Sequence, residues 1–254
     1  MFQSDLFDAT PFTLVEDADS GIRYLPDVVR QATAHAWFEQ ALANVTWGNQ
    51  RRLMYEREVD VPRLMAHFSL DAPDLPEPLI KAAAQIRMIA GTPFNSVGLN
   101  LYRDGNDSVV PHNDKTQGLV PGAPIAILSL GATRRMTLRA KSGKGRTLNV
   151  DLHAGSVMVM SYASQFTHDH GILKMSGVDG PRISLAFRCF DASTLKARQA
   201  SGSMACANIG QIAAVVLTAQ PVPKRWPPET RRGIFVCPAL ATLQVRTSAL
   251  RRFV

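Results

Sequence analysis

The sequence predicts a mainly β protein with flanking helices (α+β), in which a double-sheet jelly roll or a closed barrel forms the core and the helices pack outside it. Two observations predict this fold class, and a third shows where the regularly patterned part of the chain ends. Short strand-like runs separated by turn residues follow one another from 95 to 190. Two stretches with helical periodicity precede them, at 27–45 and 76–90. Residues 191–254 show no clear period and include a proline-rich patch, which is typical of a disordered or weakly structured basic tail.

The N-terminal part contains the two predicted helices. Strand-like runs at 12–15 and 22–25 come first, and Pro26 suits the start of the first helix. In the segment 47–68, arginines alternate with apolar residues, which favours strands and a hairpin. The second helix follows a proline-rich connection, and Gly91 is expected to end it.

Eight short strands are expected in the C-terminal half of the ordered part. Glycine-rich and proline-rich turns separate them, as in a sheet sandwich or barrel. Their expected positions are 97–103, 108–112, 125–130, 136–140, 147–152, 156–161, 166–170 and 183–190.

Composition narrows the class of protein. The chain has 254 residues, 46% of them hydrophobic, which suits one domain with additions. No apolar run approaches the roughly eighteen residues of a membrane span, and the acidic N-terminus does not resemble a signal peptide. The three cysteines have no metal-like spacing, so we expect reduced thiols in a cytoplasmic protein.

The net charge of +7 is concentrated in the tail. Residues 191–254 hold nine Lys and Arg against two acidic residues, which accounts for the whole excess. The rest of the chain is therefore balanced, and only local patches can support an argument for nucleic-acid binding.

A metal site is indicated by two histidines and one aspartate. His112 and Asp114 are two residues apart, so in an extended segment both face the same side. Alone, this pair is weak, because a loop histidine beside a helix-capping aspartate is common. His168 and His170 share one face of a later strand, so by period alone either qualifies as the third ligand. Two histidines and a carboxylate form the facial triad of non-haem Fe(II) oxygenases.

Two arginines raise the specificity of this pattern. Arg182 and Arg188 are six residues apart, so on a strand they face the same side about 20 Å apart. They would leave a gap suited to a short dicarboxylate gripped at both ends. Asn100 and Tyr102 share one face of an earlier strand and offer an amide and a phenol to the same ligand. For either arginine alone, a solvated edge-strand position is the better interpretation.

Several motifs in order resemble the AlkB family of 2-oxoglutarate- and Fe(II)-dependent dioxygenases. They are FNSVGLNLYRDG (94–105), PHNDK (111–115), PIAILSLGATRR (124–135), HGI (170–172) and PRISLAFR (181–188). The resemblance implies a double-stranded β-helix core at 95–190, in one domain with an N-terminal extension (1–94) that carries a nucleotide-recognition lid. It selects His170 as the distal ligand, beside His112 and Asp114. It assigns Asn100, Tyr102, Arg182 and Arg188 to 2-oxoglutarate.

The family's chemistry is oxidative demethylation of N-alkylated bases such as 1-methyladenine and 3-methylcytosine. The resemblance implies Fe(II), 2-oxoglutarate and O2 as cofactors and co-substrates, with formaldehyde, succinate and CO2 as products. It implies alkylated DNA or RNA as the partner, and single-stranded nucleic acid is expected over double-stranded. We expect a monomer and, since no apolar run is long enough to span a bilayer, no membrane partner. The predicted substrate contacts are basic or aromatic: Arg51, Arg52, Tyr55, Arg63, Phe68, Arg134 and Arg135.

One departure leaves the substrate open. Relatives that repair nucleic acid commonly carry an acidic residue two positions after the metal aspartate, where this chain has Thr116. A 2-oxoglutarate oxygenase acting on a tRNA base, a protein side chain or a small molecule is therefore an alternative. A non-catalytic jelly-roll binding module is a third hypothesis, which the complete triad disfavours.

Overall fold

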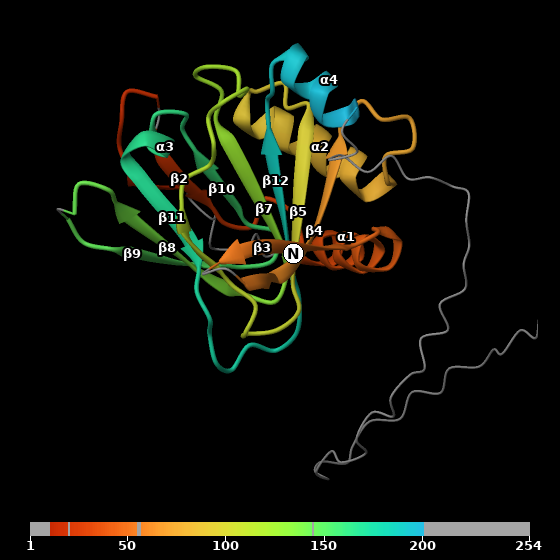
Figure 1. The fold of residues 1–254 in the computed structure, drawn as a ribbon, viewed down its shortest axis with the longest axis horizontal. Coiled ribbons are helices and arrows are strands. Elements are labelled where there is room, and N and C mark those ends of the chain that lie inside the picture. The colour runs from red at the N-terminus through yellow and green to blue at the C-terminus, as the bar shows by residue number, and fades with distance from the viewer. Residues whose placement is uncertain (1–10, 20, 55–56, 144, 201–254) are drawn as a thin grey trace, which may run out of the picture. The chain divides into compact units, whose positions relative to one another are not determined.

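The computed structural model describes residues 11–200 except 20, 55–56 and 144, and it describes no side chains for 50–60. The chain divides into two units, 1–211 and 212–254, and the second lies outside the described residues (Figure 1). The predicted tail can therefore be compared with the structure only up to residue 200. Within the described ranges, no helix is long and apolar enough to cross a membrane.

Two antiparallel sheets form the core, as the sequence predicts. Along the larger sheet the described strands run β1 (Phe12–Val15), β2 (Ile22–Leu25), β10 (Val157–Met160), β7 (Ile125–Gly131), β12 (Arg182–Arg188), β5 (Ser96–Tyr102), β4 (Arg57–Ser69) and β3 (Gly48–Met54). The smaller sheet runs β6 (Val109–His112), β11 (His168–Ile172), β8 (Arg134–Ala140) and β9 (Leu148–Leu152). The jelly-roll fold class is thereby confirmed. The N-terminal strands widen the larger sheet, so 1–94 is more than an outer cover of helices.

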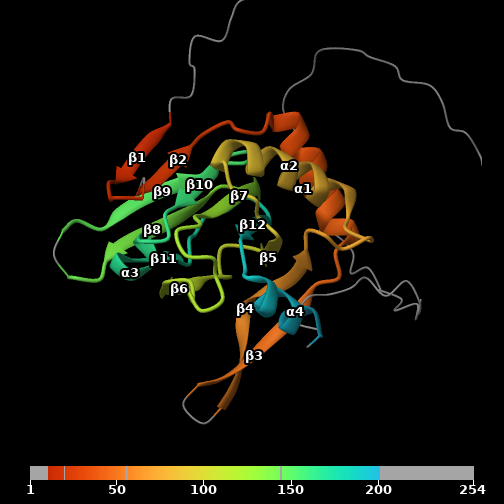
Figure 2. The same ribbon diagram turned by 90° about the horizontal axis from the view of Figure 1, so that it is seen from above.

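Two helices cover one face of the larger sheet. α1 (Gln31–Asn44) and α2 (Glu77–Ala90) lie side by side against it, away from the smaller sheet (Figure 2). α2 ends at Gly91, whose backbone is left-handed with φ 58°, as its sequence position predicts. α1 begins later than predicted, because Asp27 has φ 49° and the Val29 amide donates to the Gly155 carbonyl, so 26–29 form a turn and a bend instead.

Strand alternation separates two hydrophobic clusters. On β12, Ile183, Leu185 and Phe187 join the cluster beneath the helices, whereas Ala186 belongs to the cluster between the sheets. Val97, Leu99 and Leu101 of β5 likewise pack under the helices, as predicted. The polar side chains of the same strands, at 100, 102, 182, 184 and 188, consequently face the space between the sheets.

Two predictions need correction. The run 166–170 is not wholly a strand, since the short helix α3 (Ser164–Thr167) precedes β11. Residues after 190 are not structureless from the start, because α4 (Ala192–Ala200) follows β12. The apolar residues of α4 do not repeat at helical spacing, so the sequence gives little sign of this helix. Individual contacts with the core hold it in place.

Candidate metal centre and its two cavities

The two histidines are positioned by strand register. β6 and β11 are antiparallel neighbours in which His112 and His170 are directly paired, and their ring centroids lie 4.7 Å apart. Gly171 permits this approach: a Cβ there would lie 2.8 Å from Pro111 N and 2.9 Å from Val109 O. A glycine is therefore needed directly after His170, because any side chain there would clash with the backbone of β6.

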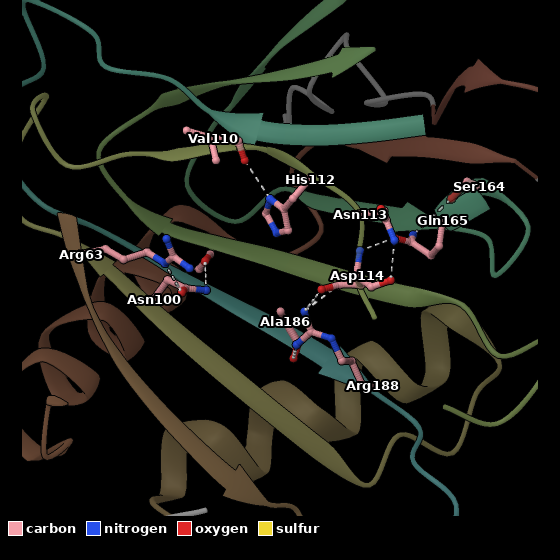
Figure 3. A network of polar contacts seen from close by, with 11 residues as sticks. Arg63, Asn100, Val110, His112, Asn113, Asp114, Ser164, Gln165, Ala186 and Arg188 are labelled. Atoms are coloured by element: carbon pink, nitrogen blue, oxygen red, sulfur yellow. Dashed lines mark hydrogen bonds and ion pairs between the residues drawn. The ribbon is translucent and has the colours of Figure 1, made fainter. Parts of the chain in front are cut away.

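Register and burial also decide between the two histidine candidates. His170 is buried, and burial lowers its pKa to about 4, so its imidazole is neutral and able to bind a cation. His168 is more exposed, and its Nδ1 lies 2.9 Å from Thr167 Oγ1. His112 Nδ1 lies 2.9 Å from the Val110 carbonyl, an arrangement that directs a proton to Nδ1 and leaves Nε2 for a metal (Figure 3).

Asp114 lies beyond the end of β6 and is held by two side chains from elsewhere. Its backbone N–H donates to Gln165 Oε1 (3.0 Å), and Arg188 Nη2 lies 2.9 Å from both of its carboxylate oxygens (Figure 3). Burial acts to raise the pKa of Asp114, but Arg188 and the two histidines outweigh it and hold the pKa below its usual value. The carboxylate is therefore ionised at neutral pH.

The donor set fits one divalent metal ion. One ligand atom from each of His112, Asp114 and His170 lies within 4.8 Å of the others, and the described residues show no other such group of three. Two imidazoles and one carboxylate on one side suit Fe(II), with the remaining positions open.

An inner cavity of about 50 Å³ lies between the sheets beside these ligands. Arg182 lies at one end, 1% exposed, with Nη2 donating to Ser129 Oγ at 2.9 Å and its guanidinium 5.3 Å from the centroid of Tyr102. Its Nε and Nη1 are buried and have no hydrogen-bond partner in the described part of the chain. Burial lowers the pKa of Arg182 to about 10, which leaves it charged at neutral pH.

A buried guanidinium with two unsatisfied N–H groups is suited to an incoming carboxylate. Asn100 lines the same cavity, where its Oδ1 accepts from Arg63 Nε at 2.8 Å. Arg188 also lines it, but its guanidinium is paired with Asp114. The predicted grip of two arginines on opposite ends of a dicarboxylate therefore reduces to Arg182 at the closed end. The inner residues fit 2-oxoglutarate in type and place.

An outer cavity of about 440 Å³ opens on the other side of the metal ligands. Arg63, His112, Asp114 and Arg188 line it together with residues that the sequence did not single out for this site: His67, Gly98, Lys115, Gln117 and Arg198. Gly98 makes room there, because a Cβ would lie 3.2 Å from His67 Cδ2 and 3.3 Å from Arg188 Nη1. Burial, then the charges of Arg188, Arg198 and Arg63, lower the pKa of His67 to about 4.

Two predicted substrate contacts are wrong, and a third lies outside both cavities, where it stays a prediction. Phe68 is 4% exposed and packs in the cluster beneath the helices. Arg134 is fully buried and donates to the carbonyls of three loop residues, Asp104, Asp107 and Leu173. Arg135 points outward into an exposed ion pair with Asp151 at 2.7 Å. Adjacent residues on β8 point to opposite faces, so only one could have faced a ligand.

The remaining substrate predictions divide in two. Arg63 lines both cavities. Tyr55 and the side chains of Arg51 and Arg52 lie outside the described residues.

Gln165 is a site residue that the sequence did not single out. It is 1% exposed on α3 and connects the segment preceding His170 to the backbone of Asp114. Lys141 Nζ donates to its carbonyl oxygen at 2.6 Å. The only sequence signal is its position five residues before the histidine, which becomes meaningful once α3 is placed.

Comparison with known proteins agrees with this geometry. The family model described as "2OG-Fe(II) oxygenase superfamily" matches residues 21–188. The DNA oxidative demethylase ALKBH2 of Homo sapiens is 32% identical over 124 residues, covering 44% of this chain and 48% of the relative. The alpha-ketoglutarate-dependent dioxygenase alkB homolog 3 of Bos taurus is 31% identical over 186 residues, covering 64% of each.

The chain spans about half the length of the ALKBH2 relatives that it matches. A prolyl hydroxylase of Trichoplax adhaerens, solved with a hypoxia inducible factor peptide, superposes with a TM-score of 0.53 over 71% of this chain and 87% of that one. At 11% identity this likeness shows the fold alone. The chain belongs to the 2OG-Fe(II) oxygenase superfamily, and the resemblance to the AlkB family that its motifs predicted is confirmed.

Proposed function

We propose that this protein is an Fe(II)- and 2-oxoglutarate-dependent dioxygenase that demethylates N-alkylated bases in DNA or RNA, single-stranded by preference, as a monomer. The observation that supports it most is one cavity in which three metal-ligating side chains meet a buried arginine with unsatisfied N–H groups. The relatives named as a DNA oxidative demethylase and an alkB homolog support the substrate class.

Different residues would bind the metal ion and the co-substrate. His112, Asp114 and His170 would hold Fe(II) on one face, and Arg182 with Tyr102 would hold the far carboxylate of 2-oxoglutarate. When bound, Fe(II) and 2-oxoglutarate supply the oxidation of an N-methyl carbon by O2, with succinate and CO2 as co-products. The hydroxymethyl group left on the base loses formaldehyde and restores the N–H or ring nitrogen.

The remaining groups orient the ligands and exclude water. Arg188 holds the Asp114 carboxylate ionised and in place, and Gln165 fixes its backbone. Apolar side chains close the inner cavity around the ligands, namely Ile127, Met136, Ile172 and Ala186. This wall keeps solvent away from the 2-oxoglutarate end of the site.

Formaldehyde and succinate formation test the proposal. With Fe(II) and ascorbate, the purified protein should form formaldehyde from a single-stranded oligonucleotide that carries 3-methylcytosine and an equal amount of succinate from 2-oxoglutarate. No succinate with any substrate would remove the dioxygenase assignment.

A second candidate is the same oxygenation of a different substrate. Thr116 stands where an acidic partner for a cationic base is expected. The charged side chains in the described lining of the outer cavity are Arg63, Lys115, Arg188, Arg198 and Asp114, so four of the five are basic. Succinate formed with a tRNA base, a peptide or a small molecule, but not with alkylated oligonucleotides, would favour this candidate.

A further inference from the structure

Helix α4 lies beyond the part of the chain that the family model matches, yet it is firmly attached to the core. Asp191 caps it by accepting from the Thr194 amide (2.8 Å) and the Ser193 hydroxyl (2.6 Å). Leu195 packs against the cluster between the sheets. Gln199 Nε2 donates to Ser69 Oγ at 3.1 Å. The helix is therefore a built part of the wall that it covers.

This helix supplies one basic side chain to the outer cavity. Arg198 lines the cavity together with His112 and Asp114, and its guanidinium lies 4.5 Å from the ring centroid of Phe190, which also lines it. A cation–π contact of this kind limits where the guanidinium can lie. A planar guanidinium can present two N–H groups side by side to an oxyanion. An arginine held in this way is preorganised for an oxyanion.

The charges around the outer cavity are predominantly positive. Its described lining has basic side chains from four places: Arg63 on β4, Lys115 after β6, Arg188 on β12 and Arg198 on α4. Asp114 is the acidic residue of that described lining, and Arg188 and the proposed metal engage it. Like charges brought together repel one another. An anionic ligand group relieves this repulsion.

We propose that α4 completes the outer cavity as a phosphate site, in which Arg198 with Lys115 binds a backbone phosphate adjacent to the alkylated base. This rests on the proposed function and adds to it the residue that secures the nucleic-acid strand. A phosphodiester suits the site because it is singly charged and presents two oxygens to the guanidinium edge. A phosphate contact positions the strand without reading its sequence.

Affinity measured without turnover tests the assignment of Arg198. Protein loaded with Mn(II) and 2-oxoglutarate would be titrated into a labelled single-stranded oligonucleotide with one 3-methylcytosine, at several salt concentrations. Arg198→Ala should weaken binding about tenfold, as loss of one charge-assisted hydrogen-bonded contact does. The slope of log affinity against log salt should become shallower by about 0.7, one single-strand phosphate contact.

The matched control is on the same helix. Lys196 is exposed and does not line the cavity, so Lys196→Ala should change affinity less than about twofold. Equal effects of the two variants would overturn the proposal. If α4 detaches in Arg198→Ala, Arg198→Lys replaces it. This variant keeps the charge and loses the planar fork, so it should still weaken binding more than Lys196→Ala does, with the salt slope unchanged.

Neutral methylphosphonate linkages identify the contact on the substrate. Placed one at a time around the alkylated base, one linkage should weaken wild-type binding and have no further effect on Arg198→Ala. Additive losses at every linkage would show that Arg198 does not contact the backbone, and would overturn the proposal. Failure of the wild type to release formaldehyde from any alkylated oligonucleotide removes the proposed function instead, a result read independently of affinity.

Discussion

The two cavities on either side of the metal ligands are built in different ways. The inner cavity takes its polar residues from adjacent strands in register: Arg182 opposes Tyr102, and Ser184 opposes Asn100. The outer cavity combines β4, the segment after β6 and helix α4. The register of two paired strands determines which side chains lie opposite each other. In loops and in a terminal helix, individual contacts determine where each side chain lies. The inner cavity is thus built by strand register, whereas the outer cavity also depends on a loop and on α4.

The largest effect is expected where the two cavities meet. Asp114→Ala removes the carboxylate ligand and the partner of Arg188, so metal affinity should fall by more than the roughly 10- to 100-fold that an outer-shell partner costs. Formaldehyde and succinate should both fall to background. Asp151→Asn, an exposed carboxylate on β9, serves as the control and should retain activity. Normal Mn(II) binding by Asp114→Ala would remove it from the metal centre.

Arginine variants test whether the inner cavity alone binds 2-oxoglutarate. Arg182→Lys keeps the charge but loses the fork, so KM for 2-oxoglutarate should rise about 10- to 100-fold, with oligonucleotide affinity unchanged. Arg134→Lys is the matched buried control. Its three bonds go to backbone carbonyls, so it should lower the free energy of unfolding and leave that KM unchanged. A change in affinity for oligonucleotide alone in Arg182→Lys would contradict the assignment.

Variants of Gln165, which lies on helix α3 and not on a strand, test whether this residue positions the metal ligand Asp114. Gln165→Leu leaves the Asp114 amide without its acceptor, and Mn(II) affinity should fall about tenfold. Gln165→Glu retains the acceptor oxygen and should recover most of that affinity. Gln85→Leu, which removes a side-chain bond to the Val28 carbonyl, is the control for stability. Equal Mn(II) binding by the Leu and Glu variants would leave Gln165 a purely structural residue.

His67 gives a pH signature of the outer cavity. Its pKa is lowered from 6.5 to about 4, so as pH falls below 6.5 the unfolded chain takes up a proton that the folded chain refuses. Stability is therefore lost between pH 6.5 and 4, by at most about 1.4 kcal/mol per pH unit for this group. His67→Gln should flatten the pH dependence of the free energy of unfolding in that range, measured in urea. An unchanged slope would show that His67 titrates normally.

The smallest effect is expected outside both cavities. Arg135 and Asp151 form an exposed ion pair, which is worth about 0–1 kcal/mol. Arg135→Ala should change neither the turnover rate nor the affinity for oligonucleotide measurably. A loss of oligonucleotide affinity comparable to that of Arg198→Ala would restore Arg135 as a substrate contact and enlarge the outer surface.

The sequence correctly predicted which side chains share one face of an extended segment. His112 with Asp114, and Asn100 with Tyr102, follow from the two-residue repeat of an extended chain, and burial then separated His170 from His168. The two-residue repeat does not show which face of β4 or β8 is directed toward the cavities and which toward the rest of the protein. Phe68 and Arg134 were therefore taken for ligand contacts, although one belongs to the core and the other ties loops together.

The sequence by itself predicted the fold class and the pairs His112 with Asp114, Asn100 with Tyr102, and Arg182 with Arg188, because periodicity reports which side chains share a strand face. The family resemblance was needed to select His170 over His168. Only the tertiary structure decided that Arg188 is paired with Asp114, that Gln165 holds the aspartate backbone, and that α4 brings Arg198 to the outer cavity. The first two contacts join residues 74 and 51 positions apart along the chain, Arg188 with Asp114 and Gln165 with Asp114. The spacing of residues within one segment carries no information on such pairings, because the partners are far apart in the sequence and meet only in the folded structure.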